Sequence, residues 1–117
     1  MKINILLKDE QKAFLDQVII DHSLKNAETS IQSLVSDILE NHDHENVFGE
    51  TRCNGGCFSA DEKISVELED EKVLKMKEIY NKYDFEIYDS EEEELSKIVR
   101  SIINYADQEA DIEKIFS

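Results

Sequence analysis

Two short stretches of the chain alternate apolar and polar residues, and they match each other. Residues 2–9 read KINILLKD and residues 63–70 read KISVELED, an offset of 61 positions. Their apolar residues recur at every second position: Ile3, Ile5 and Leu7 in the first stretch, and Ile64, Val66 and Leu68 in the second. A period of two places these side chains on one face of a strand. The pattern therefore predicts two strands, each with one face to bury.

Each predicted strand is followed by a segment with helical spacing. Residues three and four positions apart share one face of a helix. In the first half this face holds Phe14, Leu15, Val18, Ile19 and His22, and in the second half it holds Val73, Met76, Ile79, Tyr80 and Tyr83. The spacing predicts one amphipathic helix after each strand.

A second helix is predicted in each half, and the two copies match at a constant offset. Asn26 suits the N-cap of the first copy, and Ser90 with Glu93 forms a capping box for the second. Five apolar positions correspond at an offset of 64: Ile31, Leu34, Val35, Ile38 and Leu39 against Leu95, Ile98, Val99, Ile102 and Ile103. We interpret the chain as two duplicated strand-helix-helix halves.

The domain organisation follows from this duplication. A chain of 117 residues is expected to form one domain. We assign residues 1–41 to the first half, 42–60 to a connector and 61–117 to the second half. The second half ends in a C-terminal helical extension, in which Ile112, Ile115 and Phe116 would pack back on the core.

The strand-helix-helix order resembles the ribbon-helix-helix family, in which two copies pair their strands above four helices. The resemblance implies an α+β fold, mostly helical, with two halves sharing a two-stranded antiparallel ribbon. It also implies DNA binding by outward ribbon side chains, with phosphate held at the N-terminus of the second helix. The matching outward positions are Asn4, Leu6 and Lys8 on one strand, and Ser65, Glu67 and Glu69 on the other.

Carboxylates occupy several positions that would face DNA. Glu67 and Glu69 lie on the second strand, and the segment DSEEEE, residues 89–94, falls at a phosphate site. Because DNA affinity depends on Lys and Arg side chains that neutralise phosphates, we expect no direct DNA binding. Acids in the first turn of a helix also favour the helix dipole. That effect accounts for part of the DSEEEE run but not for the acidic ribbon.

The connector contains several residues of the types that bind zinc in proteins. Its segment HDHENVFGETRCNGGC, residues 42–57, contains both cysteines of the chain. Two histidines and two cysteines make a closed tetrahedral set, here His42, His44, Cys53 and Cys57. Thiolate and imidazole ligands together select zinc over magnesium or calcium. We predict a structural zinc ion that ties down the connector and fixes the two halves relative to each other.

Alternatives to this metal site stay open. Cys53 and Cys57 could form a disulfide, or the four residues could be unrelated loop residues. One histidine could be replaced as a ligand by His22, Asp43, Glu45 or Glu50. A catalytic zinc would need an open coordination position and a nearby base. Since no Ser-His-Asp pattern, glycine-rich phosphate loop or His-Glu-x-x-His motif is present, we do not expect an enzyme.

The net charge of the chain indicates which kinds of partner it would bind. With 28 acidic and 13 basic residues its formal net charge is −15 at pH 7, and residues 61–117 contribute −10 of this. Such a surface repels nucleic acid and favours a protein partner with a basic surface, although acids also keep a small protein soluble. No window approaches 18 apolar residues and no signal peptide is recognisable, so we expect an intracellular protein without a membrane span.

Size, acidity and the metal cluster together resemble phage anti-CRISPR proteins that act on type II Cas9. The resemblance implies a monomeric inhibitor in the bacterial cytoplasm. It would block target DNA loading, because Cas9 holds its heteroduplex in a positively charged channel. The implied partner-binding residues are Glu67, Glu69, Asp70, Glu71, Glu91, Glu92, Glu93 and Glu94. The alternative is a ribbon-helix-helix transcriptional regulator or antitoxin-like protein, which Lys2, Asn4 and Lys8 would favour.

Overall fold

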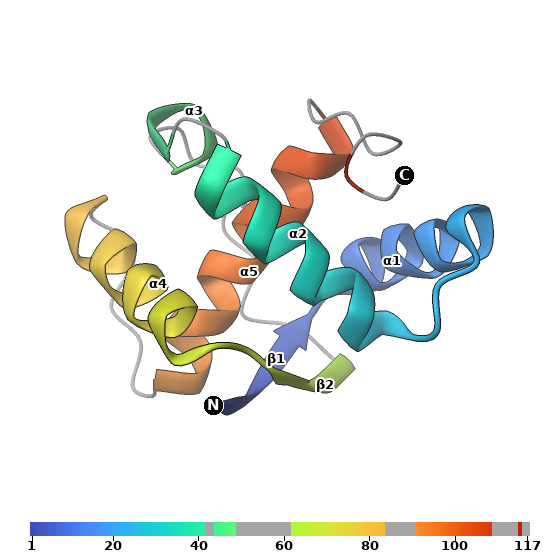
Figure 1. Cartoon of the computed structure of the whole chain (residues 1–117), viewed down its shortest axis with the longest axis horizontal. Coiled ribbons are helices and arrows are strands. Elements are labelled where there is room, and N and C mark those ends of the chain that lie inside the picture. Colours follow the sequence, from blue (N-terminus) through green and yellow to red (C-terminus); the bar gives the residue numbers. More distant parts are fainter. Residues whose placement is uncertain (42–43, 49–61, 84–90, 109–114, 116–117) are drawn as a thin grey trace.

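The computed structural model describes residues 1–41, 44–48, 62–83, 91–108 and 115. This part of the chain is mostly helical with one two-stranded antiparallel sheet, which confirms the predicted α+β class. Strand, helix and helix follow one another twice, with α3 between the two sets (Figure 1). The elements in chain order are β1 (Lys2–Leu7), α1 (Asp9–His22), α2 (Ala27–Asn41), α3 (His44–Phe48), β2 (Glu62–Glu67), α4 (Asp70–Lys82) and α5 (Glu91–Gln108).

The register of the two strands is symmetric with respect to the sequence repeat. Ile3 pairs with Val66 and Ile5 pairs with Ile64, while Asn4 pairs with Ser65. Asn4 and Ser65 are also equivalent in the repeat, at an offset of 61. A pair of equivalent residues that face each other marks a twofold axis through an antiparallel ribbon. The ribbon therefore relates the two halves by an approximate twofold rotation about this pair.

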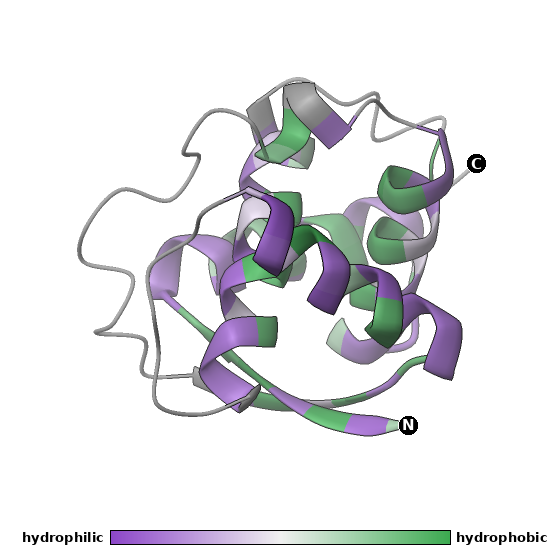
Figure 2. Ribbon diagram, turned by 90° about the vertical axis from the view of Figure 1, so that its left-hand side faces the viewer, coloured by the Kyte–Doolittle hydropathy of each residue, from purple (hydrophilic) through white to green (hydrophobic). Residues whose placement is uncertain are grey.

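The ribbon covers one side of a helical core. The helices α1, α2, α4 and α5 all lie on the same side of it, and no described helix lies on the other (Figures 1 and 2). The alternation of the strands explains this arrangement, because Ile5, Leu7 and Val66 are fully buried whereas Lys63 and Ser65 are exposed. The predicted apolar face of each strand is thus the face that packs on the helices.

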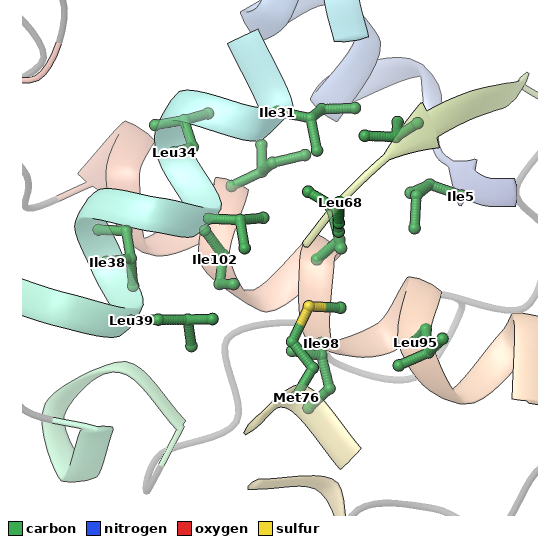
Figure 3. Close-up of a cluster of buried hydrophobic side chains, with 14 of the residues drawn as sticks. Ile5, Ile31, Leu34, Ile38, Leu39, Leu68, Met76, Leu95, Ile98 and Ile102 are labelled. Carbon is green, nitrogen blue, oxygen red and sulfur yellow. The ribbon is translucent and has the colours of Figure 1, made fainter. Parts of the chain in front are cut away.

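The centre of the core is formed by the second helix of each half. The five predicted apolar positions of α2 and the five of α5 are all buried, at 2% exposure or less. Figure 3 shows side chains from both helices meeting beneath the ribbon, together with Met76 of α4. In α5 every residue from Leu95 to Ile103 is buried, because β1, α2, α3 and α4 surround this helix.

The outer edge of β1 is covered by α5. The backbone N–H of Leu6 donates to Ser96 Oγ at 2.8 Å, and its carbonyl oxygen accepts from Arg100 Nη1 at 2.6 Å. Both side chains come from the half that does not contain β1. Unpaired groups on a strand edge invite association with other strands. These two bonds satisfy the edge at Leu6 and also join the halves.

The edge of β2 is covered in the equivalent way by α2. The N–H of Glu67 donates to Glu28 Oε2 at 2.8 Å, and its carbonyl oxygen accepts from Gln32 Nε2 at 2.7 Å. Glu67 corresponds to Leu6 at an offset of 61, and Gln32 corresponds to Ser96 at an offset of 64. In each half, side chains of the second helix therefore bond to the backbone N–H and carbonyl of one strand residue in the other half. The side chains that do so differ between the halves.

The helix ends confirm some of the capping predictions. Asn26 Oδ1 accepts the backbone N–H of Thr29 at 2.9 Å, so Asn26 is the N-cap of α2. At the end of α1, Ser23 takes a left-handed conformation with φ 53°, and its N–H bonds to the Ile19 carbonyl. Ser90 of the second predicted capping box lies outside the described residues, as do Ile112 and Phe116 of the C-terminal extension. Ile115 is partly buried against the core, as expected.

A short helix in the connector was not predicted. The helix α3 buries Val47 and Phe48, which are 0% and 3% exposed. The ring centroids of Phe48 and Tyr83 are 6.2 Å apart. The first part of the connector is therefore held to the core by its own apolar side chains. None of the helices that the structure describes is long and apolar enough to cross a membrane.

Candidate functional site

The structure describes one of the four predicted zinc ligands. His44 is the first residue of α3, whereas His42, Cys53 and Cys57 lie outside the described residues. Asp43 and Glu50 lie outside them as well. Among residues 1–41, 44–48, 62–83, 91–108 and 115, no three or more His, Cys, Asp or Glu side chains are grouped as metal ligands. The predicted site therefore stays a prediction, with His44 as its only positioned member.

The imidazole of His44 is oriented by contacts on both sides. Its Nε2 lies 2.9 Å from the carbonyl oxygen of Leu39, which accepts only, so Nε2 carries the proton. Its ring meets Phe48 edge to face, with the centroids 5.9 Å apart. The Leu39 carbonyl belongs to the last turn of α2, whose carbonyls lack intrahelical partners. His44 thus caps the end of α2 through Nε2, and Nδ1 is the ring nitrogen that does not face this carbonyl.

His22 is positioned apart from His44. It is the last residue of α1, which leads into the start of α2, whereas α3 follows the end of α2, so the two lie toward opposite ends of this helix (Figure 1). One metal ion binds histidine nitrogens at about 2.0–2.1 Å, and a separation along the 15 residues of α2, about 22 Å, does not allow this. The structure therefore argues against His22 as a replacement ligand beside His44.

The outer face of the ribbon is mixed in charge. Across the strands, Lys2 stands opposite Glu67, Asn4 opposite Ser65, and Leu6 opposite Lys63. Ser65 Oγ donates to Asn4 Oδ1 at 2.8 Å in the middle of this face. The expectation of an acidic ribbon is wrong, because the register brings two lysines onto the same face as Glu67. The carboxylates gather instead at the two ends.

One acidic cluster lies where β2 leads into α4. We call Glu67, Glu69, Asp70 and Glu71 the β2–α4 cluster, and all four residues are exposed. The Met1 ammonium lies 3.1 Å from Glu67 Oε1 and 3.2 Å from Asp70 Oδ1, and it also donates to the Leu68 carbonyl. The hydrogen bond to Glu67, assisted by Asp70, raises the pKa of this α-amino group above its usual value. Two of the four carboxylates are thus partly neutralised within the chain.

A pocket of about 200 Å³ opens beside the β2–α4 cluster. Its walls come from β2, α2 and α4, and they are formed by Gln32, Ser36, Glu67, Leu68, Glu69 and Lys72. The ammonium of Lys72 is buried and bonds to Glu40 of α2. The carboxylate partner of Lys72 is therefore Glu40 and not Glu67 or Glu69 at the same pocket.

The other acidic cluster lies at the start of α5. We call Glu91, Glu92, Glu93 and Glu94 the α5 cluster. Glu92 Oε1 lies 3.3 Å from Lys63 Nζ, so this cluster borders the other end of the ribbon face. Glu92, Glu93 and Glu94 are partly exposed, and the side chain of Glu91 lies outside the described residues. The predicted partner-binding residues therefore form two groups at opposite ends of the ribbon.

Sequence reasoning missed further acids at these two ends. Asp9 and Glu10 are exposed in the first turn of α1, and they correspond to Asp70 and Glu71 at an offset of 61. Glu28 corresponds to Glu92 at an offset of 64, and it lies against β2 beside Glu67. The repeat offsets alone could have found these residues, because equivalent positions in the two halves lie at opposite ends of the ribbon.

Comparisons with known proteins give no family for this chain. No protein-family model, no curated protein and no solved structure matches it. A functional interpretation therefore rests on the ribbon face, its two acidic ends and the predicted metal site.

Proposed function

We propose that the chain is a protein inhibitor that docks the ribbon face and its two acidic ends onto a basic protein surface. The observation that carries this proposal is the placement of the β2–α4 cluster and the α5 cluster at opposite ends of a ribbon face that no described helix covers. The Cas9–guide complex is the first partner to test, because its heteroduplex channel is positively charged. The inhibitor would exclude target DNA by occupancy, without chemistry.

Electrostatics favours a partner of this kind. Two acidic ends separated by a ribbon of six residues span roughly 20 Å, at about 3.3 Å per residue. Clusters of one sign raise association rates with an oppositely charged surface. The ribbon between them offers the amide of Asn4 and the hydroxyl of Ser65 for hydrogen bonds. Such a polar centre with charged ends suits a folded protein surface with basic side chains on either side of it.

The second candidate function is a ribbon-helix-helix regulator or antitoxin-like protein. A specific observation favours it, because the symmetric register places Lys2 and Lys63 on the outer ribbon face. Against it, Glu92, Glu93 and Glu94 occupy the N-terminus of α5, where the family would hold a phosphate. Carboxylates there would repel the phosphate backbone on which DNA affinity depends.

Target loading by purified Cas9–guide complex tests the proposed function. We expect an excess of the chain, added before target DNA, to abolish target binding in a filter or fluorescence-anisotropy assay. Raising the salt concentration should weaken the inhibition, because exposed charge pairs are screened. The matched control is the same duplex with the chain alone at low salt, where we expect no shift. Unchanged target loading at excess chain would rule out Cas9 as the partner, and a shift of the duplex alone would favour the regulator.

A structural zinc in the connector is a separate part of the proposal. The orientation of His44 supports it, because histidine ligands usually donate their other ring N–H to a carbonyl or carboxylate. Here Nε2 donates to the Leu39 carbonyl and leaves Nδ1 available for a metal. His42, Cys53 and Cys57 would complete the set, and zinc would then hold the connector to the end of α2.

The zinc proposal predicts the metal content of two variants. We expect about one zinc per chain in the parent by elemental analysis, as for a single four-ligand site. Cys57→Ser should lose this zinc and lower the melting temperature by a few degrees. His22→Gln, toward the other end of α2, is the matched control and should keep the metal. A metal-free parent with a disulfide between Cys53 and Cys57, detected by mass spectrometry, would replace zinc by the disulfide alternative.

A further inference from the structure

We propose that the two strand-helix-helix halves bind each other as separate subunits do, so that a second copy of the chain can supply the complementary half. The two units are residues 1–48 and 62–108, joined through residues 49–61. In such an exchanged dimer, the first half of one copy would pack on the second half of the other. The proposed inhibitor function is not required for this inference.

The core contacts cross between the halves. The strand β1 packs on α5 of the second half, and β2 packs on α2 of the first half. Ser96 and Arg100 bond to the backbone of Leu6, and Gln32 and Glu28 bond to the backbone of Glu67. Neither strand is therefore buried mainly by helices of its own half, and each half alone would expose its strand.

The symmetry of the ribbon makes the contacts reciprocal. The twofold axis passes between Asn4 and Ser65, and α2 packs against α5 across the same centre. A twofold interface uses the same patch on both partners. The contact between the two halves thus has the geometry of a subunit interface, although one covalent chain supplies both sides.

The length of the connector decides which copy supplies the second half. The N-terminal turns of α2 lie at the ribbon, where Gln32 bonds to Glu67. From Gln32 to its last residue, α2 extends about 14 Å further, and α3 follows it on the side of the helices away from the ribbon (Figure 1). Residues 49–61 must return to β2 and reach at most about 45 Å when extended. A connector of three residues reaches only about 10 Å, which is too short to return within one chain.

A connector deletion tests the exchange directly. Removing residues 50–59 from the full chain should give a stable dimer by light scattering, with helical circular dichroism like that of the parent. Its melting temperature should rise with protein concentration, as for any folded dimer in equilibrium with unfolded chains. The double variant Cys53→Ser/Cys57→Ser keeps the full connector and should stay monomeric, which separates connector length from loss of zinc. A folded monomer of the deletion variant would overturn the proposal.

Cleavage of the connector tests the same proposal if the deletion variant does not fold. A specific protease site is inserted between Asn54 and Gly55 of the otherwise complete chain, and the purified protein is cleaved. The two fragments should co-elute in size exclusion and keep the parent circular dichroism. Mixing two cleaved preparations of different isotopic mass should then yield mixed pairs by native mass spectrometry. Fragments that separate or unfold after cleavage, or pairs that never mix, would contradict subunit-like association.

Discussion

Replacing Ile102 by Ala is expected to lower the free energy of unfolding by about 2–5 kcal/mol. Ile102 is fully buried near the middle of α5, in one cluster with Ile38 and Leu68 (Figure 3). Since β1, α2, α3 and α4 surround α5, the neighbours of Ile102 are held by several elements. They cannot collapse freely into the space that the missing atoms leave. Urea unfolding monitored by circular dichroism measures the change.

The matched control for this prediction removes the same atoms from the surface. Ile20 lies on α1 with 72% of its surface exposed. Because Ile20→Ala leaves no cavity, we expect the free energy of unfolding to change by no more than about 0.5 kcal/mol. Similar losses in the two variants would mean that helix propensity or the unfolded state, and not the packing of α5, determines the effect at Ile102.

The sequence predicted the repeated elements because each has a buried face with its own period. A period of two marked β1 and β2, and the matched apolar positions of α2 and α5 marked the two helices that meet in the core. These signals are local, since each depends on residues within one element. The capping role of Asn26 was predictable for the same reason, because its partner Thr29 is only three residues away.

The interlocking of the halves was not predictable from these local patterns. Periodicity shows that Ile5 and Val66 are buried, but not that helices of the opposite half bury them. The polar contacts of Arg100 and Gln32 with strand backbones depend on residues 94 and 35 positions apart. The helix α3 escaped prediction because five residues with Val47 and Phe48 are too few to show a helical period.

The candidate site was predicted in part. The acidic residues at the starts of α4 and α5 are visible as charge runs, but their arrangement about the ribbon depends on the strand register. That register also brings Lys63 to the outer face, opposite Leu6, so the prediction of an acidic ribbon from the sequence is wrong. For the metal site, sequence spacing proposed four ligands, and the hydrogen bond of His44 adds the orientation of one of them.

If the chain binds the Cas9–guide complex as proposed, neutralising the two acidic ends is expected to weaken this binding by roughly 10- to 100-fold at 0.1 M salt. The variant is Glu69→Gln/Glu71→Gln/Glu94→Gln, which takes two charges from the β2–α4 cluster and one from the α5 cluster. These residues form no ion pair within the part of the chain that the structure describes, so the fold should be unaffected. Most of the loss should appear in the association rate, because exposed charges mainly steer encounter.

The control variant makes the same change in net charge away from the ribbon. Asp21 lies in the last turn of α1, Glu78 lies along α4, and Asp107 lies near the end of α5, and all three are exposed. Asp21→Asn/Glu78→Gln/Asp107→Asn should therefore bind within about twofold of the parent, since long-range attraction alone is screened beyond about 10 Å at 0.1 M salt. Surface plasmon resonance at two salt concentrations measures both variants. If the two variants weaken binding equally, net charge alone drives association and the ribbon ends have no special part in it. If only the first variant does so, the contact surface lies at the ends of the ribbon.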